Sequence, residues 1–195
     1  MYSLPTSVEI ENKEFVITNN GDFRMVLDCF KALQDETLEK EERVLAALII
    51  FYEDINCIED VLTNFSNLQE PVLKMYEFFK CGEGESVGAN THVKVIDWDN
   101  DSQLICSAIN KVAGKEIRFE PYVHWWTFMA YYLSIGECAL STIVGIRHKI
   151  AKGKKLESYE KDFKRDNPQY FNWNSRTIQQ QEADKLAREL WNSNS

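Results

Sequence analysis

Apolar and polar residues alternate at the start of the chain and then change to a helical spacing for most of its length. Val8 and Ile10 alternate with polar neighbours, and the same alternation returns after the polar connection at residues 11–13. Alternation with a period of two predicts strands, so residues 7–10 and 14–17 are expected to form a β-hairpin. Two strands alone are marginally stable, so the hairpin must pack on helices.

Apolar residues then recur every three or four positions, which is typical of amphipathic helices. Asp22, after the turn residues Asn19, Asn20 and Gly21, is expected to cap the first helix, and Gly114 to end the fifth. The expected helices follow Asp22 and otherwise span residues 38–52, 58–65, a segment from Pro71, 102–113, 121–133, 140–150, 156–163 and 175–192.

The segment 121–133 is the most distinctive part of the chain, because six of its thirteen residues are aromatic and none is charged. Pro121 suits a first helical turn, where its missing N–H lacks an intrahelical partner anyway. The run is too short to span a bilayer, which indicates a helix buried on most sides. Four of its residues are expected to form the structural centre or a partner-binding surface: His124, Trp125, Trp126 and Phe128. Arg147, one helix further on, is a candidate polar partner.

The expected fold class is mainly α, a compact helical domain with a small N-terminal β-hairpin. Residues 1–168 are expected to form this domain. A glycine-rich mobile loop at about 81–92 would divide it into an N-terminal and a C-terminal part. Residues 169–195 are expected to form a C-terminal helical extension.

Charge is unevenly distributed along the chain. The net charge is −9, yet residues 142–165 hold eight Lys and Arg against three acids. An acidic body argues against nucleic-acid binding, which depends on a basic surface. The basic stretch is therefore interpreted as a solvated helix end or a protein-contact patch. The longest apolar run, residues 44–52, is far below spanning length, and no signal-like segment follows the start. A soluble intracellular protein is expected, with no membrane contact.

Candidate chemistry is weak in this sequence. Residues 97–101 carry the start of a calcium-loop pattern, which fails at Ser102 and Ala108, where glycine and glutamate are required. An acidic helix start capped by Asp99 or Asp101 is the alternative.

Neither the histidines nor the cysteines have zinc-ligand spacing. The five cysteines are interpreted as small buried residues, and His124 as a buried histidine bonded to a carbonyl or carboxylate. We expect no catalytic residue, no cofactor and no metal.

Several segments in a shared order resemble a known family. They are the N-terminal residues 4–10, Asp22-Phe23-Arg24, the acidic segment ending near Asp101, His124-Trp125-Trp126 with Phe128, Ile143-x-Gly145-x-Arg147, and Asn167-Pro168. The family comprises short proteins encoded in the tail-gene region of siphophages and prophages of Gram-positive bacteria, just upstream of the tape-measure gene. The resemblance covers most of residues 1–168.

The resemblance implies a non-enzymatic tail assembly chaperone. Such a protein would bind the partly hydrophobic tape-measure protein in the host cytoplasm until the tail tube polymerises, and would be absent from the mature virion. The implied partners also include the product of the upstream tail assembly gene, since such proteins are often made as frameshift fusions. The uneven charge adds self-association as a homo-oligomer to the hypothesis.

Two alternatives stay open. The first is a small phage protein that binds a bacterial host protein in regulation or defence, and a host antiphage sensor is one such partner. The second is a hydrolase that uses His124 with Cys106 or Cys138, because such partners meet only in space.

Overall fold

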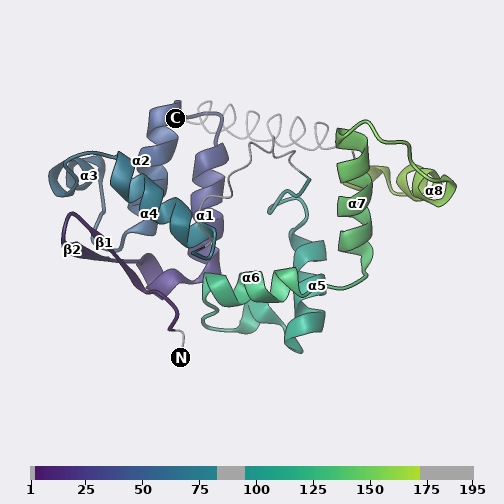
Figure 1. Ribbon diagram of the computed structural model, residues 1–195, viewed down its shortest axis with the longest axis horizontal. Helices are drawn as coiled ribbons and strands as arrows, with labels where there is room; N and C mark the ends of the chain where they lie inside the picture. Colours follow the sequence, from purple (N-terminus) through teal and green to yellow (C-terminus); the bar gives the residue numbers. More distant parts are fainter. Residues whose placement is uncertain (1–2, 83–94, 172–195) are drawn as a thin grey trace, which may run out of the picture. The chain divides into compact units, whose positions relative to one another are not determined.

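The computed structural model describes residues 3–82 and 95–171 (Figure 1). Within these ranges the chain forms eight α-helices, three short 3-10 helices and one two-stranded antiparallel sheet, which confirms the expected fold class. The elements are β1 (Ser7–Ile10), β2 (Lys13–Val16), η1 (Thr18–Gly21), α1 (Phe23–Gln34), α2 (Lys40–Phe51), α3 (Ile58–Asn64), α4 (Gln69–Phe79), α5 (Ser102–Ala113), η2 (Ile117–Phe119), α6 (Trp125–Leu133), α7 (Ala139–Ala151), α8 (Ser158–Asp166) and η3 (Pro168–Tyr170).

The chain divides into two compact units. Unit 1 comprises residues 1–90 and 105–135, and unit 2 comprises residues 91–104 and 136–195. The boundary falls inside α5, between Leu104 and Ile105. The expected domain limits stay a prediction. Most of the expected loop at 81–92 and the expected last helix at 175–192 lie outside the described residues.

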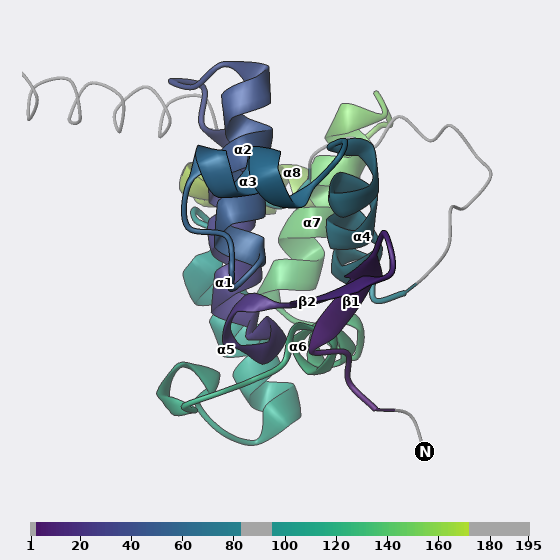
Figure 2. The same cartoon turned by 90° about the vertical axis from the view of Figure 1, so that its left-hand side faces the viewer.

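The hairpin closes through a two-residue turn and not through the expected three-residue connection. Val8 pairs with Phe15 and Ile10 with Lys13, so β2 begins one residue earlier than the sequence suggested. Glu11 and Asn12 both have positive φ angles, 51° and 62°. A two-residue turn with this geometry matches the right-handed twist of the strands, which explains the shorter connection. In unit 1 the hairpin lies beside α4, as Figure 2 shows.

Capping residues set the starts of the first two helices, at Phe23 as expected and at Lys40 instead of the expected residue 38. The Asp22 carboxylate accepts a hydrogen bond from the Arg24 amide and so caps α1. Glu39 and Glu42 form a reciprocal capping box at the start of α2. The two helices then pack side by side in unit 1 (Figure 1), with Val26, Leu48 and Phe51 fully buried.

The aromatic helix begins later than expected. α6 starts at Trp125. His124 instead forms an isolated antiparallel bridge with Asp22, and the Val123 carbonyl accepts from the Phe23 amide at 2.9 Å. The Val123 amide donates to the Asp22 carboxylate at 2.8 Å. In a helix that started at Pro121, the Val123 carbonyl would instead accept an intrahelical bond from Thr127. The bonds to Asp22 and Phe23 therefore favour an extended chain up to His124.

Unit 2 contains α7, α8 and η3, joined by polar contacts. Lys149 on α7 and Glu160 on α8 form an ion pair at 2.7 Å. The hydrogen bond from Lys149 lowers the pKa of Glu160 and the same contact raises the pKa of Lys149. Among the helices of the described residues, none has both the length and the apolar composition that a membrane crossing requires.

Candidate functional site

His124 is the N-cap of the aromatic helix. Its Nδ1 accepts a hydrogen bond from the Trp126 amide at 3.0 Å, and its Nε2 lies 2.9 Å from the carbonyl oxygen of Pro5. Because Nδ1 accepts and Nε2 faces a carbonyl, these contacts require the neutral tautomer with its proton on Nε2. The expected bond from a buried His124 to a backbone carbonyl is therefore confirmed. Both ring nitrogens serve the fold, which leaves neither poised as a general base.

The two adjacent tryptophans of α6 cap the end of α4. The Trp125 indole N–H donates to the Phe79 carbonyl at 2.9 Å, and the Trp126 indole N–H donates to the Phe78 carbonyl at 3.0 Å. The carbonyls at the end of a helix lack intrahelical donors, and a buried one left unpaired is costly. Backbone amides also serve this last turn: the carbonyls of Tyr76, Glu77 and Phe78 accept from the amides of Lys80, Gly82 and Cys81. The indoles thus complete the termination of α4.

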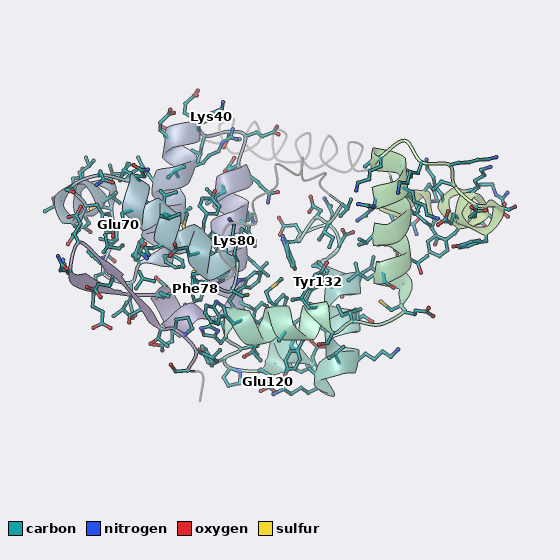
Figure 3. All side chains as sticks on the ribbon, viewed as in Figure 1. Lys40, Glu70, Phe78, Lys80, Glu120 and Tyr132 are labelled. Carbon is teal, nitrogen blue, oxygen red and sulfur yellow. The ribbon has the colours of Figure 1, made fainter. Side chains whose placement is uncertain are left out.

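Trp125 and Trp126 differ in burial. Trp125 is 1% exposed, with Phe30 and Phe128 rings 5.7 Å and 5.6 Å from its own. Phe128 also stacks on Phe23 of α1 at 4.5 Å. Trp126 is only partly buried and lies near the rings of Phe78 and His124. Phe78, labelled in Figure 3, belongs to α4. The aromatic helix therefore forms part of the core of unit 1 with one face, and Trp126 remains partly open to solvent.

Gly21 fits the close approach of η1 to this cluster. Its φ is +78°, and a Cβ atom at this position would lie 2.7 Å from Cζ of Phe78 and 3.0 Å from Nε2 of His124. Asn19 and Asn20 precede it with φ near 50°, a conformation that asparagine tolerates better than most residues. This left-handed turn places Asp22 against Val123.

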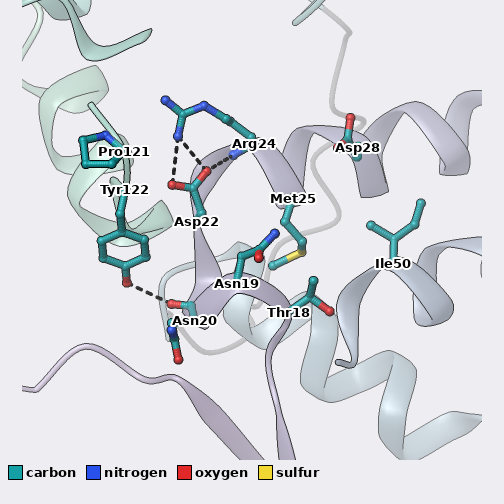
Figure 4. A pocket seen from close by; sticks show the side chains of 10 residues that line it. All are labelled: Thr18, Asn19, Asn20, Asp22, Arg24, Met25, Asp28, Ile50, Pro121 and Tyr122. Atoms are coloured by element: carbon teal, nitrogen blue, oxygen red, sulfur yellow. Dashed lines mark hydrogen bonds and ion pairs between the residues drawn. The ribbon is translucent and has the colours of Figure 1, made fainter. Parts of the chain in front are cut away.

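Arg24 connects the start of α1 to the η2 turn. Its guanidinium binds both carboxylate oxygens of Asp22 at 3.0 Å. The other terminal nitrogen donates to the carbonyls of Ile117 at 3.3 Å, Arg118 at 3.4 Å and Glu120 at 2.8 Å. Figure 4 shows this pair at one side of a surface pocket of about 520 Å³, which Tyr122 also lines. The Tyr122 hydroxyl donates to the Asn20 carbonyl at 2.9 Å, so the pocket walls are fixed.

Arg147 is the centre of unit 2. Its guanidinium forms a two-point ion pair with Asp101, at 2.6 Å and 3.0 Å. It also donates to the Val95 carbonyl at 3.1 Å and twice to the Tyr170 carbonyl, at 2.9 Å and 2.6 Å. These bonds engage all five guanidinium N–H groups, and the Arg147 and Asp101 side chains are only 8% and 1% exposed.

Arg147, which the sequence offered as a polar partner of the aromatic residues, takes the partners described above from unit 2. His124, Trp125, Trp126 and Phe128 lie together in unit 1, whereas Arg147 belongs to unit 2. Because Arg147 is buried, it does not contribute to the exposed charge of the basic stretch. The exposed cations of that stretch include Lys152, Lys154 and Lys155.

Asp101 is neither a simple helix cap nor part of an open calcium loop. Beside its ion pair with Arg147, its carboxylate accepts from the Asp97 amide at 3.0 Å. The Asp97 carboxylate in turn accepts from the amides of Asp99 and Asn100. The acids thus close their own turn, and no group of three or more potential metal ligands occurs in the described residues.

The cysteines do not all match the interpretation as buried residues. All five are free thiols, but only Cys29 is buried, and Cys57 is exposed at the start of α3. Cys106 is half-buried, and this burial raises the pKa of its thiol. A protonated thiol is a poor nucleophile, so the environment of Cys106 is opposite to that of an activated cysteine.

We expect acid to weaken unit 1 through His124. Burial lowers the pKa of His124, so the unfolded chain, with a pKa of about 6.5, binds the proton more readily than the folded chain. Stability is then fully present above about pH 6.5 and falls as the pH decreases through the lower pKa of the folded state. Protonation removes the Nδ1 acceptor that caps α6, an effect of about 1 kcal/mol.

Urea unfolding between pH 8 and pH 5 measures this loss. His124→Asn is the matched control, because its amide oxygen can cap a helix without titrating in this range. The variant is expected to show a shallower decrease than the natural chain. Parallel curves for the two proteins would mean that other groups cause the acid sensitivity.

Comparison with known proteins gives one match. Residues 1–171 match the family described as Bacteriophage Gp15 protein, and the chain belongs to this family. The match ends one residue beyond Tyr170, whose carbonyl Arg147 binds. No curated protein and no solved structure matches the chain. The family assignment therefore supplies a bacteriophage context, and the fold is described from this chain alone.

Proposed function

We propose that this protein is a non-enzymatic tail assembly chaperone. It binds the tape-measure protein in the host cytoplasm before the tail tube polymerises, acts with the product of the upstream tail assembly gene, and is absent from the mature virion. Two findings support the proposal in general terms. The chain belongs to a bacteriophage family, and its ordered motifs resemble proteins encoded beside the tape-measure gene.

The observation that carries the proposal is the distribution of exposed apolar side chains in unit 1. Large apolar side chains stand open on separate elements: Leu62 on α3 is 66% exposed, Leu133 on α6 is 73% exposed and Phe119 in η2 is 88% exposed. Separate apolar contacts suit a protein that must hold a client and then release it, because several weak contacts combine and are lost one at a time. A helical client would offer matching apolar positions along one face.

Co-expression with the neighbouring tape-measure protein tests this proposal. The chaperone is expected to move the tape-measure protein from the pellet to the soluble fraction and to co-purify with it. An unrelated acidic helical protein of similar size is the control for charge and expression load. A parallel culture adds the upstream partner. If the tape-measure protein precipitates in both cultures, the proposal fails and binding to a host protein becomes the better hypothesis.

A further inference from the structure

The η2 turn holds a nearly fully exposed phenylalanine on a fixed backbone. Phe119 is 88% exposed, whereas Ile117, two residues before it, is fully buried and anchors the turn in unit 1. Pro121 and Tyr122 follow it and are also exposed. Single exposed apolar residues are common on protein surfaces and need no explanation. Here three exposed residues fall within four positions, at the end of the η2 turn and just after it, and we call them the Phe119 patch (Phe119, Pro121 and Tyr122).

Hydrogen bonds hold the backbone of this turn from two sides. Arg24 binds the carbonyls before and after Phe119, most closely that of Glu120 at 2.8 Å. Asn110 of α5 accepts from the Ile117 amide at 2.9 Å and donates to Glu116 at 2.7 Å. The turn is therefore ordered before any partner arrives. Binding through it loses little conformational entropy, which is the usual advantage of a pre-organised anchor.

The charged residues next to Phe119 in the sequence are paired with one another. Glu116 bonds to Arg118 at 2.8 Å, and Lys115 bonds to Glu120 at 2.9 Å. The Arg118 hydrogen bonds lower the pKa of Glu116 to about 2, so this pair stays charged over the working pH range. Neighbouring ions that are already paired favour an apolar contact, because no unpaired charge must lose its water there.

The adjoining pocket supplies a preference for one kind of client. Pro121 and Tyr122 line it on the side of the patch, and the exposed acid Asp28 lines it as well (Figure 4). An amphipathic helix fits both features when its apolar face covers the patch and a lysine or arginine at its edge faces Asp28.

From this arrangement we propose that the Phe119 patch is the anchor for an apolar helical segment of the tape-measure protein that carries a basic residue beside its apolar face. This inference rests on the proposed chaperone function. Phe119 fills an apolar site on the client, and the charged residues next to it in sequence, already paired with one another, add no unpaired charge to the contact.

Phe119→Ser tests the proposal in the same co-expression assay. The serine variant is expected to melt at the natural temperature, because the exposed ring contributes little to the fold. It is expected to recover about tenfold less soluble tape-measure protein per chaperone, since aromatic anchors dominate such contacts. Ile58→Ser is the matched control: it removes another exposed apolar side chain, 48% exposed at the start of α3 and outside the contacts proposed for the client, and should change the recovery less than threefold. Phe119→Tyr keeps the ring and should restore most of the recovery.

The outcomes separate the inference from the function on which it rests. If the natural chain leaves the tape-measure protein insoluble even with the upstream partner, both proposals fail. If the natural chain and Phe119→Ser recover equal amounts, the chaperone function stands and the Phe119 anchor is refuted. If Phe119→Ser converts an oligomer of the chain into monomers while client recovery persists, the patch contacts a second copy, which also refutes the anchor.

Discussion

Trp125→Ala is expected to lower the free energy of unfolding of unit 1 by about 3–5 kcal/mol. The side chain is 1% exposed and lies among rings from α1 and α6. Its removal leaves a cavity and also leaves the Phe79 carbonyl at the end of α4 without its indole donor. Urea unfolding followed by far-ultraviolet circular dichroism measures the loss.

Three further variants put this loss in context. Trp125→Phe keeps one aromatic ring but removes the indole N–H and part of the ring system, so it should cost less than Trp125→Ala and at least the roughly 1–3 kcal/mol of the unpaired carbonyl. Leu133→Ala on the same helix is the control and should stay within about 0.5 kcal/mol, because that side chain is 73% exposed. Trp126→Ala should lose less than Trp125→Ala, since Trp126 is only partly buried. An unchanged unfolding curve for Trp125→Ala would show that the aromatic helix is not part of the core.

Arg147→Ala is expected to destabilise unit 2 by about 3–5 kcal/mol, the usual result of removing one partner of a buried ion pair. The variant leaves Asp101, 1% exposed, as a buried charge that has lost its cation. It also removes the donors to the carbonyls of Val95 and Tyr170. The stability of Arg147→Lys should lie between those of the natural chain and Arg147→Ala, because lysine keeps the charge but lacks the two-point geometry.

Hydrogen exchange locates the effect of Arg147→Ala. Amides of α7 and of residues 168–171 should exchange faster, while those of α1 and α2 in unit 1 keep their natural rates. Lys152→Ala, at an exposed position just after α7, is the control and should leave all these rates unchanged. Natural exchange rates in α7 of the Arg147→Ala variant would show that the ion pair does not hold unit 2 together.

The parts of the fold that depend on neighbours in sequence were predicted well. The hairpin, the Asp22 cap and the helix after it follow from alternation, spacing and a single carboxylate. Gly114, with φ +68°, ends α5 as expected. The start of the aromatic helix was wrong by four residues. Pro121 suits a first helical turn and an extended segment equally, and the bonds that decide between them come from Asp22, about a hundred residues away.

The hydrogen-bond partners at the polar centres of both units could not be predicted from the sequence, because they are distant along the chain. His124 and Pro5 are 119 residues apart, and Arg147 and Asp101 are 46 apart. Neither pair has a local spacing that marks it. The one available signal was that Asp101 and Arg147 both stand in the segments on which the resemblance to a phage family was based. That signal gave no pairing, so Asp101 was interpreted as a cap and Arg147 as a partner of the aromatic helix.

The two centres hold the folded body on which the proposed chaperone surface depends. In unit 1, His124, Trp125 and Trp126 connect α6 to the N-terminal segment and to the end of α4. Arg24 continues this network to the turn that carries Phe119. Residues of the family motifs therefore support the exposed surface from behind, which is consistent with a binding role for a side chain outside those motifs.

The measurement that tests the central claim most directly is the mass of the particle recovered when the chain and the tape-measure protein are co-expressed. Size-exclusion chromatography with light scattering gives this mass. The account predicts one peak that contains both proteins, with several copies of the chain on each tape-measure protein, because separate weak contacts require several copies along a long client. A chain that elutes without the tape-measure protein, while the tape-measure protein pellets even beside the upstream partner, would contradict it.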